Sequence, residues 1–208
     1  MLGAIAGLSV GPSTVAFMGS HFQTLVDLDA TPVDAKVLAA RGLEWLVEEE
    51  IVRAERTDCV LGAPWGYPPG PRWARAVGRE DWEPSDGLKI ETGRTVFHGG
   101  QGDAGYAVCP CCAAQVDLYT DEWDEIEGAW EPFDQAIGTW HDTDRAAVAC
   151  PHCGRAGELG VWLWDNDHYA FGYLGFEFWN WPEFSPGFLE RFAGVLGGHR
   201  TVLVGGKL

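Results

Sequence analysis

The stretches Cys109-Pro110-Cys111-Cys112 and Cys150-Pro151-His152-Cys153 decide how the central part of the chain folds. Each contains a pair of cysteines separated by two residues. Two such pairs are typical of a site in which four thiolates hold one tetrahedral zinc ion. The spacing predicts four metal ligands, which are Cys109, Cys112, Cys150 and Cys153. We therefore expect a structural Zn²⁺ that ties two distant segments of the chain together.

The residues around each cysteine pair predict a β-strand, a tight turn and a second strand. The first pair follows the apolar residues 107–108, is followed by Ala113 and leads to the apolar segment 116–118. The second pair follows 148–149, is followed by the turn-forming Gly154 and Gly157 and leads to the apolar segment 161–164. Two such hairpins facing one ion resemble a zinc ribbon, and the resemblance covers residues 105–165. The 37 residues 113–149 exceed the spacing of a compact ribbon. We expect them to form a lobe of their own.

Two other roles for the cysteines fit the sequence less well. Residues 150–153 match the redox motif of strongly oxidising thioredoxin-like enzymes, which requires a helix starting at the first cysteine. The glycine-rich residues that follow predict no helix. Disulfides within the two pairs would leave Cys59 and Cys111 unpaired. We predict that Cys111 and His152 do not bind the metal, with Cys111 replacing one ligand as the alternative.

The charge of the chain is strongly acidic and unevenly distributed. The 208 residues include 31 acidic and 14 basic side chains, for a net charge of −17. Residues 1–100 hold 14 acidic and nine basic residues, whereas residues 101–208 hold 17 and five. Many zinc ribbons serve nucleic acids, but this half would repel phosphate, so nucleic acid is an unlikely partner. A basic protein partner is the sharper interpretation, and a solvated acidic surface is the plainer one.

Nothing in the sequence predicts a membrane segment. Residues 1–10 are apolar but lack the basic start of a secretory signal, and we interpret them as an interior strand. No apolar run reaches transmembrane length. Because the cysteines form a metal pattern and not a disulfide framework, we expect a cytoplasmic protein.

The remaining pattern predicts alternating strands and helices. We expect strands at 14–18, 22–28, 51–61, 88–97 and 201–204, and a central, buried aromatic strand that follows a hairpin turn at 165–167. A helix from 32 to about 50 would be capped by Thr31 and begin with Pro32. Its predicted inner face is Val33, Val37, Leu38, Leu43, Leu46 and Val47. Ser185-Pro186 predicts the start of a last helix, which Gly197-Gly198 would end. Residues 62–86 form a long loop.

The predicted fold class is α+β, with a small mixed or antiparallel sheet and two main helices. Residues 1–208 would form a single domain, and residues 105–165 an inserted zinc-ribbon module whose acidic lobe, 113–149, holds one or two short helices. A ferredoxin-like layout is one candidate. The tail Phe178-Trp179-Asn180-Trp181-Pro182 resembles that of uncharacterised bacterial proteins of similar size, a resemblance that covers residues 88–208 and implies no activity.

These features favour a non-catalytic bacterial protein that acts through protein–protein contact. Four thiolates leave no open position for water on zinc, and we find no catalytic constellation. The acidic lobe, including Asp121, Glu122, Asp124 and Glu125, would meet a basic partner as an inhibitor or immunity protein does. The alternative is an enzyme or small-molecule binder with a deep pocket lined by Trp162, Trp164 and Trp179. The GxGxxG match at 100–105 opens no predicted helix, so we expect no nucleotide there.

Overall fold

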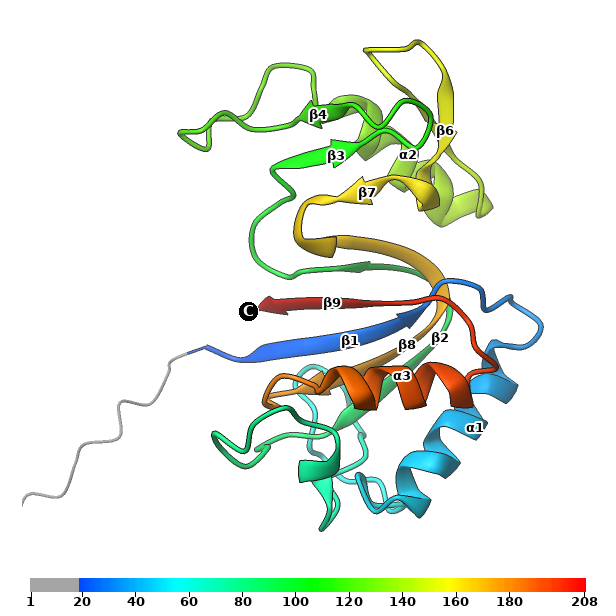
Figure 1. Cartoon of the computed structure of the whole chain (residues 1–208), viewed down its shortest axis with the longest axis vertical. Helices are drawn as coiled ribbons and strands as arrows, with labels where there is room; N and C mark the ends of the chain where they lie inside the picture. The colour runs from blue at the N-terminus through cyan, green and yellow to red at the C-terminus, as the bar shows by residue number, and fades with distance from the viewer. Residues whose placement is uncertain (1–18) are drawn as a thin grey trace, which may run out of the picture.

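The computed structural model describes residues 19–208, and its main sheet has four strands. These are β1 (His21–Asp27), β2 (Leu88–His98), β8 (Tyr169–Trp179) and β9 (Thr201–Lys207). They lie in the order β2-β8-β1-β9, and every neighbouring pair is antiparallel. With a helix after β1 and another after β8, this is the strand order and direction of a ferredoxin-like layout. The α+β prediction is confirmed (Figure 1).

Helices α1 (Ala35–Glu48) and α3 (Pro186–Val195) cover one face of this sheet (Figure 1). They pack on large buried side chains of β8 and of one another, including Leu174, Phe176, Phe178, Phe188 and Phe192. The α3 cap is as predicted, since Ser185 Oγ accepts a hydrogen bond from the Phe188 N–H at 3.2 Å.

The start and the buried face of α1 differ from the prediction. The helix begins at Ala35, after a turn in which Thr31 and Asp34 exchange hydrogen bonds between side chain and backbone. Val33 and Val37 are 90% and 60% exposed. Leu38 and Leu46 are buried as predicted, and Leu43 and Val47 pack partly buried against the core. The rest of the buried face carries the small residues Ala35, Ala39 and Gly42. A Cβ on Gly42 would lie 2.6 Å from Cζ of Phe176, so the aromatic core selects a small-residue face.

The β2–β8 hairpin is long and bends over the other face of the sheet (Figure 1). Its pairing shifts between Thr92 and Thr95, which marks a bulge. Its far end contacts β9, because Gly100 bridges to Lys207. The bend buries a small apolar cluster between the hairpin and strands β1 and β9: Val26, Phe97, Ala170 and Val204. A Cβ on Gly175 would lie 2.3 Å from Phe97, so the glycine makes room for the ring.

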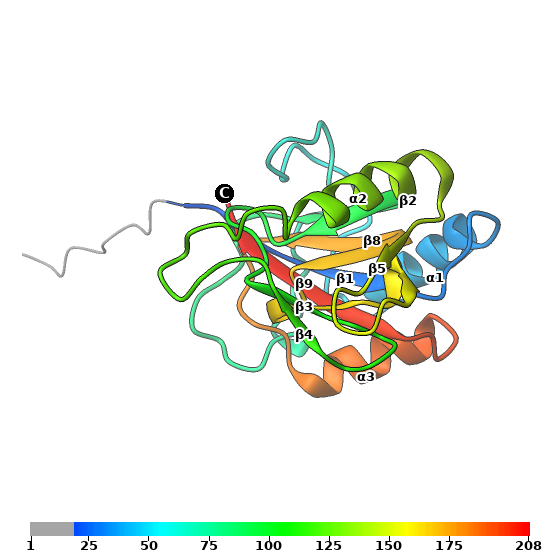
Figure 2. The same cartoon turned by 90° about the horizontal axis from the view of Figure 1, so that it is seen from above.

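The connection between β2 and β8, residues 99–168, forms an insert on the face opposite α1 and α3 (Figures 1 and 2). Its elements are β3 (Tyr106–Val108), β4 (Gln115–Asp117), α2 (Glu131–Thr143), β5 (Ala147–Ala149), β6 (Ala156–Glu158) and β7 (Leu163–Trp164), with 3₁₀ turns at Leu159–Val161 and Asp165–Asp167. Strands β4, β3 and β7 form one small sheet, and β5 and β6 another. We keep the division into one domain and an inserted module as a prediction.

Several predicted elements are wrong. Residues 51–61 form turns with isolated bridges, such as Val52 to Pro69, and not a strand. The turn at 165–167 is no hairpin, because β7 pairs with β3 whereas β8 joins the main sheet. The long loop predicted at 62–86, in contrast, is confirmed, with one short 3₁₀ turn, Trp73–Arg75, and isolated bridges as its regular structure. The strands predicted at 1–10 and 14–18 lie outside the described residues. Within residues 19–208 no helix is long and apolar enough to span a membrane.

The aromatic tail after β8 closes the main core. Asn180 adopts a left-handed backbone conformation with φ of 51°. Its side chain accepts a hydrogen bond from the His21 N–H at 3.0 Å and donates one to Asp86 at 2.6 Å. Trp181 is fully buried and donates its indole N–H to the carbonyl of Asp86. The tail therefore joins β1, β8 and the end of the long loop, which is a structural role.

Candidate metal centre

The first cysteine turn joins β3 to β4. The N–H of Cys109 donates to the carbonyl of Ala114 at 2.9 Å, and the N–H of Ala113 donates back to the carbonyl of Cys109 at 2.9 Å. Ala113 has a φ of 56°, a left-handed conformation that costs an alanine about 1 kcal/mol. This tight closure places the sulfurs of Cys109 and Cys112 on the same side of the turn.

The second cysteine turn joins β5 to β6 and repeats the same pattern. The N–H of Cys150 donates to the carbonyl of Arg155 at 3.0 Å, and the N–H of Gly154 donates to the carbonyl of Cys150 at 2.8 Å. Gly154 takes the left-handed position, with a φ of 69°. The prediction of two strand–turn–strand units is confirmed. The second strand of this unit is β6, Ala156–Glu158, and not the predicted 161–164.

The two turns bring the four predicted ligand sulfurs together. The Sγ atoms of Cys109, Cys112, Cys150 and Cys153 all lie within 4.8 Å of one another. Cys112 and Cys150 are 3.7 Å apart, too far for a disulfide, whose S–S distance is about 2.0 Å. Four sulfurs placed about 2.3 Å from a tetrahedral zinc ion are about 3.7 Å apart, a separation that the Cys112–Cys150 pair already has. The cluster therefore has the dimensions of a site for one metal ion.

Backbone hydrogen bonds favour the thiolate form of Cys109 and Cys153, whereas the pKa of Cys112 is raised to about 12. Cys109 and Cys150 are each 1% exposed, and the N–H of Cys111 donates to the Cys109 sulfur at 3.3 Å. The backbone N–H of Arg155, together with its guanidinium, lowers the pKa of Cys153 to about 6. Arg155 also donates to the carbonyl of Cys111, which links the two turns. Donors of this kind around the ligands orient them and offset part of the negative charge of four thiolates.

The two inner residues, Cys111 and His152, lie outside the cluster of four sulfurs. The Nε2 atom of His152 lies 2.9 Å from the carbonyl oxygen of Gln115, so this ring joins the second turn to the strand after the first. The Cys111 sulfur lies 4.0 Å from the carbonyl oxygen of Ala156. Among residues 19–208, Cys109, Cys112, Cys150 and Cys153 are the only cluster with metal-binding geometry.

A close packing contact between the two turns was not predicted from the sequence. A Cβ on Gly157 would lie 2.6 Å from Cγ of Pro110, so only glycine lets the first turn rest on β6. The carbonyl of Gly157 accepts the indole N–H of Trp162, which is 3% exposed, at 3.3 Å. The only hint in the sequence is that a glycine, Gly157, follows the second cysteine pair while the first pair contains Pro110. Such a contact depends on how the turns face each other, which spacing alone does not define.

The chemistry available to this cluster is structural. Four sulfurs around one ion leave no position for water or substrate, and no helix starts at Cys150, since the motif leads into β6. The thioredoxin-like alternative is thus not supported by the fold. The deep pocket proposed around Trp162, Trp164 and Trp179 is also absent, because all three side chains are 3–6% exposed within apolar clusters.

The insert has a hydrophobic core besides the cysteines. Phe133, Ala136 and Trp140 of α2 pack on the small strands, and Phe171 of β8 joins the same cluster. Of the one or two short helices predicted in the acidic lobe, the structure has one, α2, and Pro132 lies in its first turn. Comparison of the chain with known protein families, with curated proteins and with solved structures gave no match.

Proposed function

We propose that the four-cysteine cluster binds one Zn²⁺ as a structural ion, and that the protein is a non-catalytic module whose fold depends in part on this metal. The observation that supports the proposal is the convergence of four sulfurs from two matching turns, within 4.8 Å of one another. Thiolate ligands and a structural role both favour zinc. Thiolates also require a reducing compartment, which is consistent with the cytoplasm.

The metal can be tested directly on the full-length protein. We expect one zinc per chain by elemental analysis, and a cobalt(II)-substituted form with the absorption spectrum of a tetrahedral tetrathiolate site. A protein purified under reducing conditions that binds neither ion would contradict the proposal. A spectrum with fewer than four sulfur ligands would point to an open site, whereas the Cys111 alternative would keep four sulfur ligands and would be recognised by zinc loss in Cys111→Ser.

We further propose that the protein acts by contact with a basic protein partner through the acidic loop, residues 120–125. Asp121, Glu122, Asp124 and Glu125 are all exposed, and Trp123 between them is 65% exposed. The loop is closed by a bridge between Tyr119 and Glu125. No lysine or arginine occurs between residues 113 and 144. An exposed tryptophan is a typical anchor residue of a protein interface. Side chains of one charge sign around it would attract a partner of the opposite charge.

The role of the metal in this proposal is to position the loop. The loop follows β4, the strand that leaves the first cysteine turn, so its base depends on the turn that the ion closes. The charge pattern suits an inhibitor-type protein that covers the nucleic-acid-binding surface of a basic partner. Such a partner would be recognised with strong salt dependence, because the contacting charges are exposed.

The experiment compares two sets of four charge-neutralising substitutions. One set converts Asp121, Glu122, Asp124 and Glu125 to Asn or Gln. The control set does the same at Glu55, Glu80, Asp81 and Glu83, which are also exposed but lie in the main domain. Partners cross-linked to the wild-type protein in cells are identified by mass spectrometry. We expect the loop set to lose a basic partner that the control set retains, and equal recovery with both would refute the assignment of the loop.

A further inference from the structure

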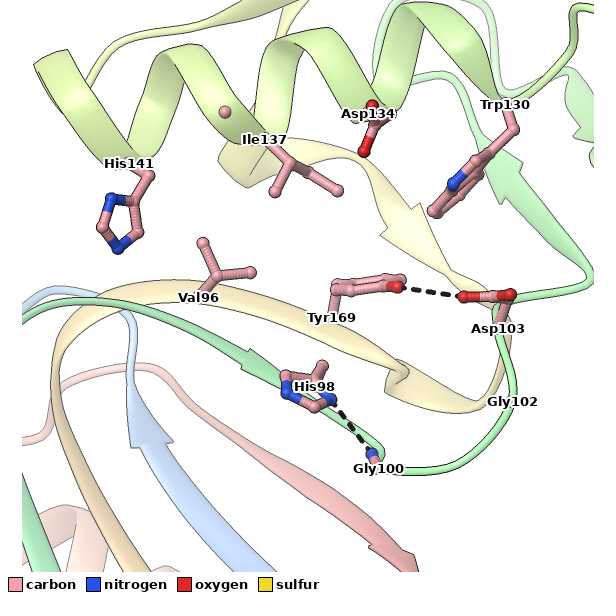
Figure 3. Close-up of a pocket in the computed structure, with 11 residues that line it drawn as sticks. Val96, His98, Gly100, Gly102, Asp103, Trp130, Asp134, Ile137, His141 and Tyr169 are labelled. Atoms are coloured by element: carbon pink, nitrogen blue, oxygen red, sulfur yellow. Dashed lines mark hydrogen bonds between the residues drawn. The ribbon is translucent and has the colours of Figure 1, made fainter.

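A pocket of about 670 Å³ lies between the insert and the main sheet (Figure 3). One wall is the face of α2 that carries Asp134 and Ile137, together with Trp130, the residue that precedes the helix. The opposite wall is the end of the β2–β8 hairpin, with Val96 and Tyr169. This volume is within the range of small-molecule sites. Neither the metal cluster nor the acidic loop contributes a residue to it.

Two aromatic rings form one end of the pocket. The ring centroids of Trp130 and Tyr169 are 5.9 Å apart, and their planes are inclined by 37°. Trp164 lies behind both and is buried, with its own ring 6.0 Å from Trp130 and 4.9 Å from Tyr169. The two lining rings are therefore held in place by packing. They present π faces to a ligand without needing to rearrange.

A carboxylate is oriented beside these rings. One oxygen of Asp103 accepts a hydrogen bond from the hydroxyl of Tyr119 at 2.8 Å. The other accepts one from the hydroxyl of Tyr169 at 3.5 Å (Figure 3). The hydrogen bond to Asp103 raises the pKa of Tyr119 to about 12, and burial raises the pKa of Tyr169 to about 12. Both phenols therefore remain neutral donors at physiological pH. An ionised carboxylate has about four acceptor positions, so Asp103 can accept further bonds from a ligand.

A second carboxylate faces the same space from α2. Figure 3 shows the side chain of Asp134 pointing from the helix into the pocket. It has no hydrogen-bond or salt-bridge partner among the described residues 19–208. The other polar lining side chains are the imidazoles of His98 and His141, and no lysine or arginine of the described chain lines the pocket. The pocket therefore combines two carboxylates with two aromatic faces and lacks a cation of its own.

We propose that this pocket binds a guanidinium group. A planar guanidinium can stack on Trp130 or Tyr169 while its N–H groups fork onto Asp134 and Asp103, a combination that a compact ammonium matches less well. The net charge of −17 raises the local concentration of any cation. A free alkylguanidine and an arginine side chain share this chemistry. The inference does not rest on the proposed partner contact, because the pocket and the loop at 120–125 are separate.

The test uses N-butylguanidinium and its neutral analogue N-butylurea on the full-length, zinc-loaded protein. Binding is followed by NMR through the indole N–H signal of Trp130, at low ionic strength and about pH 8, above the usual titration range of imidazoles. We expect the guanidinium to bind with a dissociation constant on the order of 1 mM. N-butylurea should bind at least roughly tenfold more weakly, because it lacks the charge.

Two variants of α2 distinguish binding in the pocket from nonspecific attraction of a cation to acidic side chains. Asp134→Asn removes the lining carboxylate, and Glu131→Gln removes the other acid of the first helical turn, which does not line the pocket. We expect roughly tenfold weaker binding for Asp134→Asn and less than a twofold change for Glu131→Gln. Equal losses in both variants, or equal binding of the urea, would overturn the proposal.

A third probe distinguishes the source of the guanidinium. A capped Gly-Arg-Gly peptide should bind as tightly as N-butylguanidinium if the pocket takes a protein side chain, and more weakly if it takes a free metabolite. In both cases the Asp134→Asn variant must weaken binding. Because the loop residues Asp121 to Glu125 do not line the pocket, neutralising them tests the partner contact separately. If either the partner contact or the guanidinium site is refuted, the other can therefore still be tested.

Discussion

Replacing Cys112 by serine should abolish tight zinc binding, whereas the same change at the adjacent Cys111 should not. The two residues differ by one position in the same turn. Only Cys112 lies in the four-sulfur cluster, 3.7 Å from the Cys150 sulfur, whereas Cys111 lies near the carbonyl oxygen of Ala156 at 4.0 Å. Cys112 is exposed, so the substitution creates no cavity and its effect reports on ligation alone.

The expected loss of zinc affinity is obtained by dividing the free energy of zinc binding equally among the four ligands. Structural zinc sites bind with about 10–16 kcal/mol, so one thiolate of four accounts for roughly 3 kcal/mol. Since each 1.4 kcal/mol is tenfold, the Cys112→Ser variant should bind zinc at least about 100-fold more weakly. For Cys111→Ser, which loses one long sulfur–carbonyl contact, we expect a change of less than about threefold.

The assay is competition for zinc against a chromophoric chelator of known affinity, under reducing conditions. Amide hydrogen exchange on the same samples shows which part of the fold responds. Exchange should rise in the turns around Cys109 and Cys150 of the Cys112→Ser variant, while β1 and β8 stay protected, because the main core contains no cysteine of the cluster. Equal zinc affinities of the two variants would refute the ligand assignment. Loss of protection throughout the main sheet would refute the local role of the metal.

Three further substitutions test the packing and the titration of particular residues. Gly175→Ala would place a Cβ 2.3 Å from Phe97 and should lower the free energy of unfolding in urea by about 2–3 kcal/mol, part of which Phe97→Leu restores. Gly154→Ala meets nothing within 4 Å but forces an alanine to a φ of 69°, so we expect a loss of about 1 kcal/mol. Burial lowers the pKa of His168, against opposing effects of Asp103 and Asp165. The unfolded chain therefore binds the proton first as pH falls below about 6.5, and stability declines from there through the lower folded pKa. His168→Gln should flatten that decline in urea titrations.

Each of these predictions has a contrary outcome. Gly194→Ala, at a helical position with nothing within 4 Å, should stabilise the protein by up to about 1 kcal/mol and is the control for both glycine variants. If Gly175→Ala were as stable as that control, the close approach of Phe97 would be wrong. A wild-type stability that did not change between about pH 6.5 and pH 5 would mean that His168 is as readily protonated in the folded state as in the unfolded chain.

Features whose hydrogen-bonding partners lie close together in the sequence could be predicted from it. Each cysteine turn is fixed by hydrogen bonds within six residues, so the spacing and the flanking small residues were sufficient. The same holds for the α3 cap at Ser185, whose acceptor lies three residues from its donor. The order of strands and helices also restricted the main sheet to a few layouts, of which the ferredoxin-like one is observed.

Features that depend on distant partners could not be predicted. Residues 51–61 have strand-forming composition, but they pair only through isolated bridges, because a strand needs a continuous neighbour. The buried face of α1 is decided by the rings of Phe176 and Phe192, which leave room only for a glycine at position 42. The larger Val33 and Val37 are therefore exposed to solvent. The pocket in Figure 3 combines β2, the loop after it, α2 and β8, and no local pattern brings these segments together.

The place of the insert has a consequence for the kinetics of folding. The N–H of Gly99 donates to the carbonyl of His168 at 2.9 Å, so the two ends of the insert meet at the mouth of the β2–β8 hairpin. If the insert is still unfolded, pairing these strands closes a loop of about 70 residues, which costs roughly 2.5 kcal/mol more than closing a four-residue turn. A zinc-loaded insert that folds first removes most of that penalty. We therefore expect refolding rates to rise with zinc concentration, even where the equilibrium stability of the main sheet does not.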